Sequence, residues 1–235
     1  MTSGQVILIT GTSRGIGKFL TQHYCQKNFQ VIGVSRTAPD WKAPSNYTHH
    51  ILDISNEKEV ADLFKTLRTS FKRLDVLINN AAINPKIAPA MLMSMTDLVQ
   101  TMSVNFFGTF LMSREAAKLM MRNQFGRIIN LSSMAVKHEV AGEAAYTSSK
   151  AAVVAFTRVF SKEVYAQGIT CNVVAPAAIE TQMMAAVDKN ALADVLKRNA
   201  IPEIGEFADV AAATDWLILK ESQKITGQTI YLGGA

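Results

Sequence analysis

"TGTSRGIG" (residues 10–17) follows the apolar run "VILIT" (6–10) and precedes "KFLTQHYCQK" (18–27), which has a helical pattern. Its three glycines lie where a strand would turn into a helix. At such a junction Gly11 permits a tight turn, Gly15 lets the main chain approach a phosphate, and Gly17 lets the helix pack closely on the sheet. The N–H groups and positive dipole end of that helix favour a pyrophosphate, so the stretch predicts a dinucleotide-binding loop.

Two other motifs share this stretch, and neither fits the rest of the sequence. Gly11, Ser13 and Gly15 match the G-x-S-x-G elbow of hydrolases, which also need a partner histidine further along the chain. None of the later histidines has a suitable setting for that role. A P-loop requires Ser or Thr directly after its lysine, whereas Lys18 is followed by Phe19. Dinucleotide binding is therefore the reading that we retain.

Short apolar runs recur along the chain and alternate with amphipathic stretches. One such stretch is 56–71, in which Val60, Leu63, Phe64 and Leu67 form one helical stripe. Apolar strands separated by helices predict a mostly parallel sheet covered on both faces. We expect one α/β domain over residues 1–235, with a substrate lid at about 182–205 that includes Met183, Met184, Ala185, Val187 and Leu192. The expected strands are 6–10, 30–35, 48–52, 74–79, 127–132, 169–175 and 228–232.

Composition narrows the class of protein. The chain has 235 residues, of which 49% are apolar, and a formal charge of +5 from scattered Lys and Arg. Scattered charge is typical of solvated helix faces and not of a nucleic-acid surface. Cys25 and Cys171 lie in apolar surroundings, no histidine has metal-ligand spacing, and no apolar run is long enough for a membrane span. We expect a cytoplasmic protein that binds no metal, no nucleic acid and no membrane.

Further motifs follow the glycine loop in a particular order. They are "LDI" (52–54), "NNAA" (79–82), Asn105 in "SVNFFG", Ser133 in "INLSSMA", "YTSSK" (146–150) and "NVVAPAAIET" (172–181). With the glycine loop they make the chain resemble the short-chain dehydrogenase/reductase family over essentially its whole length. The resemblance implies a doubly wound Rossmann-type domain with seven strands in the order 3-2-1-4-5-6-7.

Four residues are candidates for catalysis. Tyr146 and Lys150 are one helical turn apart, so they share a face, and a neighbouring ammonium is expected to lower the pKa of a phenol. By resemblance, Tyr146 exchanges a proton with the substrate oxygen, and Ser133 hydrogen-bonds the same oxygen. Lys150 also holds the nicotinamide ribose, and Asn105 anchors a water between Lys150 and solvent. A plain helix hydrogen bond is the alternative role for Asn105.

The residues after the second strand bear on the cofactor. NAD enzymes carry an acid there for the ribose hydroxyls, whereas this chain has Ser35 and Arg36, with Asp40 too far along. Arg14 in the glycine loop can reach the same place, and such groups suit a 2′-phosphate, so we expect NADP(H) in preference to NAD(H). The full set of predicted cofactor contacts is Gly11, Ser13, Arg14, Gly15, Ile16, Gly17, Ser35, Arg36, Asp53, Ile54, Asn80, Ala81, Tyr146, Lys150, Pro176, Ile179 and Thr181.

The substrate is less defined by the sequence. "GRIINLSS" (126–133), "AYTSSKAAVVAFT" (145–157) and "ITGQT" (225–229) look like the 3-oxoacyl-[acyl-carrier-protein] reductases of the family. Ala82 and Ala177 replace usual glycines, and Gln124 and Gln167 replace arginines that commonly dock the acidic carrier. We expect a carbonyl reductase of a 3-oxoacyl thioester. The alternatives are a free ketone, polyketide or sugar-like alcohol and, more remotely, a non-catalytic nucleotide-binding scaffold.

The helices around 97–120 and 145–167 are apolar well beyond one face. Relatives pair subunits through such helices, so a homo-oligomer, tetramer or dimer, is expected. Tight packing of both helices against the sheet within one chain is the alternative.

Overall fold

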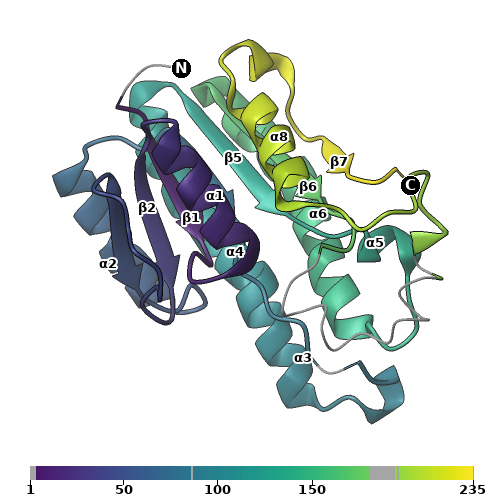
Figure 1. Ribbon diagram of the computed structural model, residues 1–235. Coiled ribbons are helices and arrows are strands. Elements are labelled where there is room, and N and C mark those ends of the chain that lie inside the picture. The colour runs from purple at the N-terminus through teal and green to yellow at the C-terminus, as the bar shows by residue number, and fades with distance from the viewer. Residues whose placement is uncertain (1–3, 86, 180–193, 195, 235) are drawn as a thin grey trace.

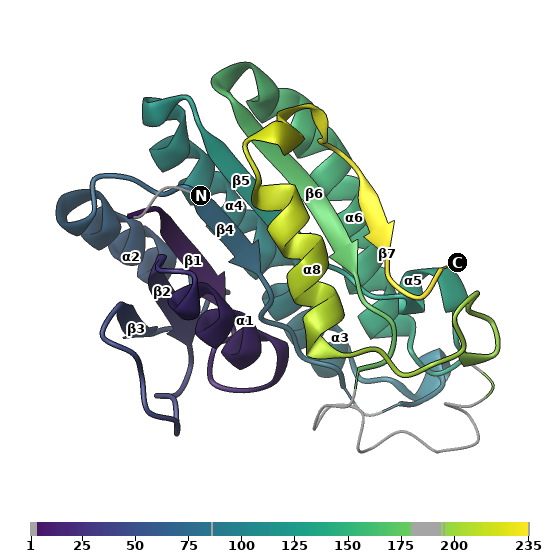
Figure 2. The same ribbon diagram turned by 45° about the horizontal axis from the view of Figure 1, so that its top comes forward.

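The computed structural model describes residues 4–85, 87–179, 194 and 196–234. Seven strands form one sheet in the order β3-β2-β1-β4-β5-β6-β7, and every neighbouring pair is parallel (Figures 1 and 2). The predicted strand order is confirmed; the predicted bounds of β1, β2 and β6 match, and those of the other four strands differ by one or two residues. The strands are β1 (Val6–Thr10), β2 (Gln30–Ser35), β3 (Tyr47–Ile51), β4 (Val76–Asn79), β5 (Gly126–Leu131), β6 (Ile169–Ala175) and β7 (Thr229–Tyr231).

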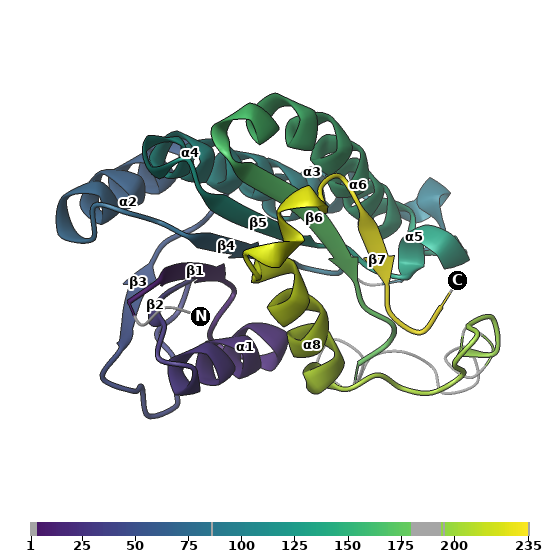
Figure 3. The same ribbon diagram turned by 90° about the horizontal axis from the view of Figure 1, so that it is seen from above.

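Helices cover both faces of the sheet, as Figure 3 shows. On one face lie α1 (Gly15–Gln26) and α8 (Phe207–Ile218). On the other lie α2 (Glu57–Ser70), α4 (Thr109–Met120) and α6 (Ala144–Val164). The shorter helices are α3 (Met95–Met102), which a π-helical turn, η2 (Ser103–Gly108), joins to α4, and α5 (Ala135–His138). None of the described helices is long and apolar enough to cross a bilayer.

The two faces explain why the strands read as unbroken apolar runs. Successive side chains of a strand point to opposite faces, so Leu8 packs beneath α2 and α4 while Ile7 and Ile9 pack beneath α1 and α8. All three side chains are fully buried. Each contributes about 2 kcal/mol by leaving water. Cys25 and Cys171 are buried free thiols.

The carboxyl ends of the parallel strands meet at one edge of the sheet, where the predicted site residues gather. The loops after β1, β4, β5 and β6 and the first turns of α1 and α6 all open there. Ligands of doubly wound folds bind at this edge. Of the predicted lid, only residues 194 and 196–205 belong to the described part of the chain, and Met183, Met184, Ala185, Val187 and Leu192 lie outside it.

Candidate active site

The loop between β1 and α1 depends on its glycines. Gly11 and Gly15 have φ values of +76° and +56°, a region that side chains disfavour. A Cβ added at Gly11 would lie 2.7 Å from the side-chain nitrogen of Asn80, and one at Gly17 only 2.1 Å from the carbonyl oxygen of Gly11. Backbone therefore approaches backbone at this turn, and only glycine fits.

Asn80 and Ala81 hold the glycine loop from the end of β4. The Asn80 side-chain amide donates to the carbonyl oxygens of Thr10 (2.8 Å) and Gly11 (3.2 Å). The backbone N–H groups of Asn80 and Ala81 both donate to the Thr10 hydroxyl at 3.0 Å. Two of the predicted cofactor contacts thus shape the loop itself.

The start of α1 fits a pyrophosphate. Within the described residues, no side chain caps this helix, and its first turn carries no acid. By contrast, Asn56 caps α2 and accepts hydrogen bonds from the backbone of Lys58 and Glu59. The first N–H groups of a helix need acceptors, and a phosphate supplies them where side chains do not. Ser13, Arg14 and Ile16 line this entry.

The predicted adenosine contacts lie at the carboxyl ends of β2 and β3. Ser35 is buried at the last position of β2, and exposed Arg36 follows it. Asp53 is engaged by Ser55, whose N–H and hydroxyl both donate to its Oδ1, at 2.9 and 2.7 Å. Ile54 is buried against Gly108, where a Cβ would lie 2.7 Å from its side chain. Arg36 and Asp53 therefore border the same end of the sheet.

Lys150 and Tyr146 project from the first turns of α6 beside β5. The ammonium of buried Lys150 donates a 2.8 Å hydrogen bond to the carbonyl oxygen of Leu131, and it lies 5.9 Å from the ring centroid of Tyr146. The hydroxyl of Ser132, also buried, donates to the backbone oxygen of Lys150. Its neighbour Ser133 interacts instead with the Tyr146 hydroxyl. The end of β5 thus positions both the ammonium and the phenol.

The electrostatics of the pair differ from the sequence-based expectation. Burial raises the pKa of Tyr146 to about 12, an effect that the hydrogen bond from Ser133 opposes and the charge of Glu143 reinforces. Burial also lowers the pKa of Lys150 to about 8. The prediction that Lys150 lowers the pKa of Tyr146 is therefore wrong for the protein without its cofactor. The ammonium of Lys150 lies 5.9 Å from the ring centroid and donates its hydrogen bond to Leu131, so it stabilises a phenolate only weakly. The cost of desolvating the phenolate is larger than this stabilisation.

Asn105 sits in the π-helical turn η2, a type of turn that is frequent at functional sites. Its buried side chain is fully engaged: Oδ1 accepts from the N–H of Ile83 at 2.8 Å, while Nδ2 donates to the Ile83 carbonyl at 2.8 Å and to the Ser149 hydroxyl at 3.0 Å. These bonds tie η2 to the segment after β4 and to α6, which is a structural role other than the plain helix hydrogen bond of the alternative. A water relay through Asn105 stays a prediction.

The segment after β6 lies close to the loop that carries Ser133. The carbonyl oxygen of buried Pro176 accepts from the N–H of Met134, so this segment lies beside the Ser133 loop. Ile179 is buried and forms a parallel bridge with Gly205. Thr181, the last predicted nicotinamide contact, lies outside the described residues.

Sequence reasoning missed several groups of this site. Glu143 lies three residues before Tyr146 and acts on its pKa, and that spacing is a signal that a helical projection reveals. Ser149 and the Leu131 carbonyl are visible only in three dimensions, because they act through contacts with Asn105 and Lys150.

Comparison with known proteins gives a consistent result. A family model described as short chain dehydrogenase matches residues 5–192. The 3-oxoacyl-[acyl-carrier-protein] reductase FabG of Haemophilus influenzae is 32% identical over 98% of this chain and 97% of its own. A structure of ElxO with NADP bound is 26% identical, with a TM-score of 0.88 over 97% of this chain and 96% of that one.

A short chain dehydrogenase from Leptospira borgpetersenii with bound NAD+ has a TM-score of 0.90 over 99% of this chain and 92% of its own. It is 24% identical, so this likeness concerns the fold. The family match covers most of the chain, and the glycine loop and the Tyr146–Lys150 pair occupy one edge of the matching fold. The chain belongs to the short-chain dehydrogenase/reductase family and is an NAD(P)-dependent oxidoreductase.

Proposed function

We propose that this protein is an NADPH-dependent carbonyl reductase whose substrate is a 3-oxoacyl thioester. The observation that carries the proposal is the convergence of Ser133, Tyr146 and Lys150 at the edge of the sheet onto which the glycine loop opens. NADPH, when bound, supplies the hydride. The chain's own residues then have to bind the carbonyl, orient it and deliver a proton.

Each of the three side chains has a distinct part in that chemistry. The phenol of Tyr146 is protonated across the neutral range, since its pKa is raised to about 12, so it donates a proton to the carbonyl oxygen. The Ser133 hydroxyl stabilises negative charge that develops on the same oxygen. Lys150 holds a positive charge close to the phenol and to the ribose position.

The preference for NADPH rests on the end of β2. Ser35 ends the strand and Arg36 follows, so a hydroxyl and a guanidinium stand where an NAD enzyme carries an acid. Arg14, the residue before α1, adds a second guanidinium at the glycine loop. ElxO, which is similar over nearly the whole chain, has NADP bound in its structure.

The similarity to FabG reductases suggests the thioester substrate. The region around Gln124 and Gln167 suggests a free ketone instead. Gln124 and Gln167 lie close together, since a Cβ on Gly168 would be 2.1 Å from the Gln124 carbonyl oxygen. Two neutral side chains there offer no charge attraction to an acidic carrier. A free ketone is therefore the second candidate.

We also propose that the chain forms a homo-oligomer through the outer face of α4 and α6. Phe110 of α4 and Val159 of α6 are exposed by 38% and 58%, and Phe107 of the adjoining turn η2 by 49%. Phe156 of α6 stacks on Phe160, with ring centroids 5.0 Å apart. Large apolar side chains exposed on neighbouring helices are typical of a subunit interface, and a second copy is the partner that we propose. Light scattering of Val159→Glu tests this against Lys65→Glu, a change at an exposed position of α2: only the Val159 change should yield monomers.

The function is tested by following NADPH oxidation with matched ketones presented on acyl carrier protein, on coenzyme A and free. We expect turnover, with the thioesters ahead of the free ketones, and loss of turnover in Tyr146→Phe but not in Tyr165→Phe, an exposed tyrosine. Faster turnover of free ketones would replace the thioester with the second candidate. No turnover with any ketone, despite NADPH binding, would favour a nucleotide-binding scaffold.

A further inference from the structure

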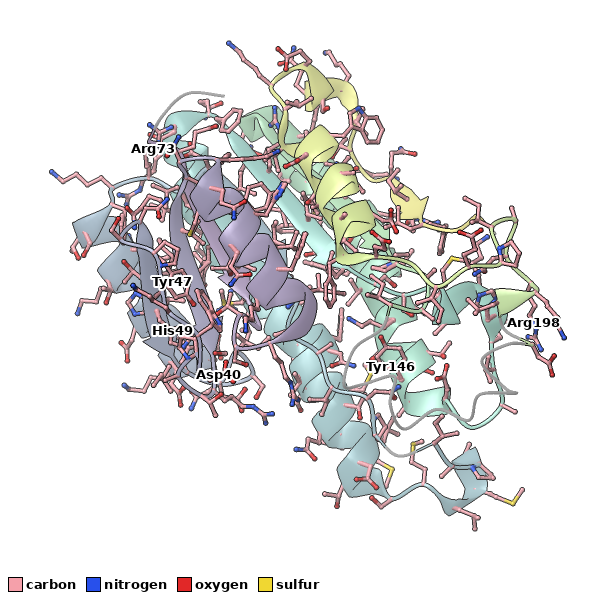
Figure 4. The ribbon with its side chains drawn as sticks, viewed as in Figure 1. Asp40, Tyr47, His49, Arg73, Tyr146 and Arg198 are labelled. Atoms are coloured by element: carbon pink, nitrogen blue, oxygen red, sulfur yellow. The ribbon has the colours of Figure 1, made fainter. Side chains whose placement is uncertain are left out.

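A chain of hydrogen bonds links the glycine loop to the end of β2 through two side chains of β3. The Thr12 hydroxyl lies 2.9 Å from the Tyr47 hydroxyl, which lies 2.6 Å from Nδ1 of His49. Nε2 of His49 lies 3.3 Å from the Ser35 hydroxyl and 3.2 Å from the Thr37 carbonyl oxygen. Figure 4 shows Tyr47 and His49 together, well away from Tyr146.

This network depends on a glycine in β2 that leaves space for the Tyr47 side chain. Tyr47 and His49 are two residues apart on β3, so their side chains point to the same face of the sheet, next to β2. Gly33 of β2 lies under the Tyr47 ring, where a Cβ would be 2.0 Å from the hydroxyl oxygen. The indole of Trp41 also packs against that ring, with centroids 5.1 Å apart. The tyrosine is thus fixed, with its hydroxyl between Thr12 and His49.

The direction of each hydrogen bond follows from its acceptors. A carbonyl oxygen only accepts, and the Ser35 hydroxyl donates its proton to the Thr37 carbonyl at 2.8 Å. Nε2 of His49 faces that same carbonyl and the remaining lone pair of Ser35, so Nε2 carries the proton and donates. Burial lowers the pKa of His49, which leaves a neutral ring whose Nδ1 accepts from Tyr47.

Two donors therefore compete for one carbonyl. Ser35 has a single hydroxyl proton, and to bind a phosphate oxygen it must turn that proton away from Thr37. Without another donor the Thr37 carbonyl would lose a partner, which opposes the turn. The Nε2–H of His49 already lies within hydrogen-bonding distance of this carbonyl and can satisfy it alone.

We propose that His49 is a positioning residue for the cofactor's 2′-phosphate: it takes over the Thr37 carbonyl and so frees the Ser35 hydroxyl to donate to the phosphate. The proposal rests on the preference for NADPH stated above. His49 does not contact the phosphate itself. It acts through Ser35, and Tyr47 and Thr12 fix the ring in the tautomer that donates from Nε2.

The test compares two nucleotides by isothermal titration calorimetry, with no turnover involved. Adenosine 2′,5′-bisphosphate carries the phosphate in question and adenosine 5′-monophosphate lacks it. In His49→Phe we expect the preference for the bisphosphate to fall about tenfold, since a hydrogen bond to a charged group is lost, while 5′-monophosphate binding is unchanged. His50→Phe is the matched control, because His50 is the next residue of β3 and points to the other face.

A second set of variants separates positioning from plain structural support. Ser35→Ala should lower the preference to the same extent, and adding His49→Phe to it should change nothing more. His49→Gln, whose amide can donate to the Thr37 carbonyl, should recover part of the preference, and it also serves if His49→Phe fails to fold. Equal weakening of both nucleotides in His49→Phe, or additive losses in the double variant, would overturn the role of His49. An unchanged preference in Ser35→Ala would instead remove Ser35 from the proposed NADPH site.

Discussion

Lys150 places its ammonium nitrogen 5.9 Å from the ring centroid of Tyr146, one turn earlier on α6. Lys150 is buried and Tyr146 is half-buried, and desolvation moves their two pKa values apart, down from 10.5 to about 8 for Lys150 and up from 10.0 to about 12 for Tyr146. Since desolvation disfavours whichever form is charged, it keeps the phenol neutral and weakens the hold of the lysine on its proton. A neutral phenol is a proton donor, which suits reduction of a carbonyl.

Adjacent serines at the end of β5 should have separable roles. Ser133→Ala removes the hydroxyl that faces Tyr146 and that accepts from the Ala135 N–H, so we expect kcat to fall by about a hundredfold and stability to fall no more than in Ser132→Ala. Ser132→Ala removes a buried hydrogen bond to the Lys150 carbonyl, so we expect a loss of about 1 kcal/mol in unfolding free energy and a kcat within a fewfold of the parent. Steady-state kinetics and urea unfolding of both variants measure the difference. The reverse pattern would exchange the roles of the two serines.

The pH dependence of reduction should follow Lys150. Its ammonium is charged below its pKa of about 8 and neutral above it, whereas Tyr146 keeps its proton until about 12. We therefore expect kcat/KM for ketone reduction to be constant below pH 7 and to fall through a single ionisation near pH 8. A profile measured in constant ionic strength buffer tests this. If kcat/KM stays flat to pH 10, the charge of Lys150 has no part in the rate.

The strand positions and their order are predictable because each strand is buried on both faces and bounded by polar turns. The glycine loop is predictable because Gly11 and Gly17 occupy places where a Cβ meets backbone or side-chain atoms. These features depend on local sequence and on a repeated pattern. The fold therefore follows from the sequence alone.

The electrostatics of the site do not follow in the same way. The i, i+4 spacing of Tyr146 and Lys150 is readable from the sequence, but their desolvation depends on residues from β5 and the loops around it. The Leu131 carbonyl that takes up the Lys150 ammonium is a backbone group and has no sequence signature. Similarly, the link from Thr12 to Ser35 joins residues of three separate segments through Tyr47 and His49.

Lys150→Met should abolish activity and leave the fold as stable or more so. Burial lowers the pKa of Lys150 from 10.5 to about 8, so the charged lysine destabilises the folded state by ~3 kcal/mol at pH 7. Lys150→Met removes this cost, but it leaves the Leu131 carbonyl without its donor, which typically costs about 1–3 kcal/mol.

The pH dependence gives the sharper test of that variant. Between pH 8 and 10.5 the unfolded parent binds more protons than the folded parent, so parent stability rises with pH across this window. The advantage of Lys150→Met should thus be complete below pH 8 and disappear by about pH 10.5. Urea unfolding of both proteins at pH 7 and pH 10 measures it. If the difference in unfolding free energy between the variant and the parent is the same at both pH values, Lys150 has an ordinary pKa in the folded protein.

Asp75, the residue before β4, is 1% exposed and ties the start of β1 to the segment that enters β4. Its carboxylate accepts from the Val6 N–H at 2.7 Å and from Arg73 at 2.9 and 2.6 Å. Asp75→Ala leaves the buried Val6 N–H without its acceptor, while the half-exposed Arg73 turns to solvent, so we expect a loss of about 1–3 kcal/mol in unfolding free energy. Asp62→Ala, at an exposed acid paired with Lys58, is the matched control and should change stability little. Comparable urea midpoints for the two variants would show that the carboxylate of Asp75 does not hold these strand ends together.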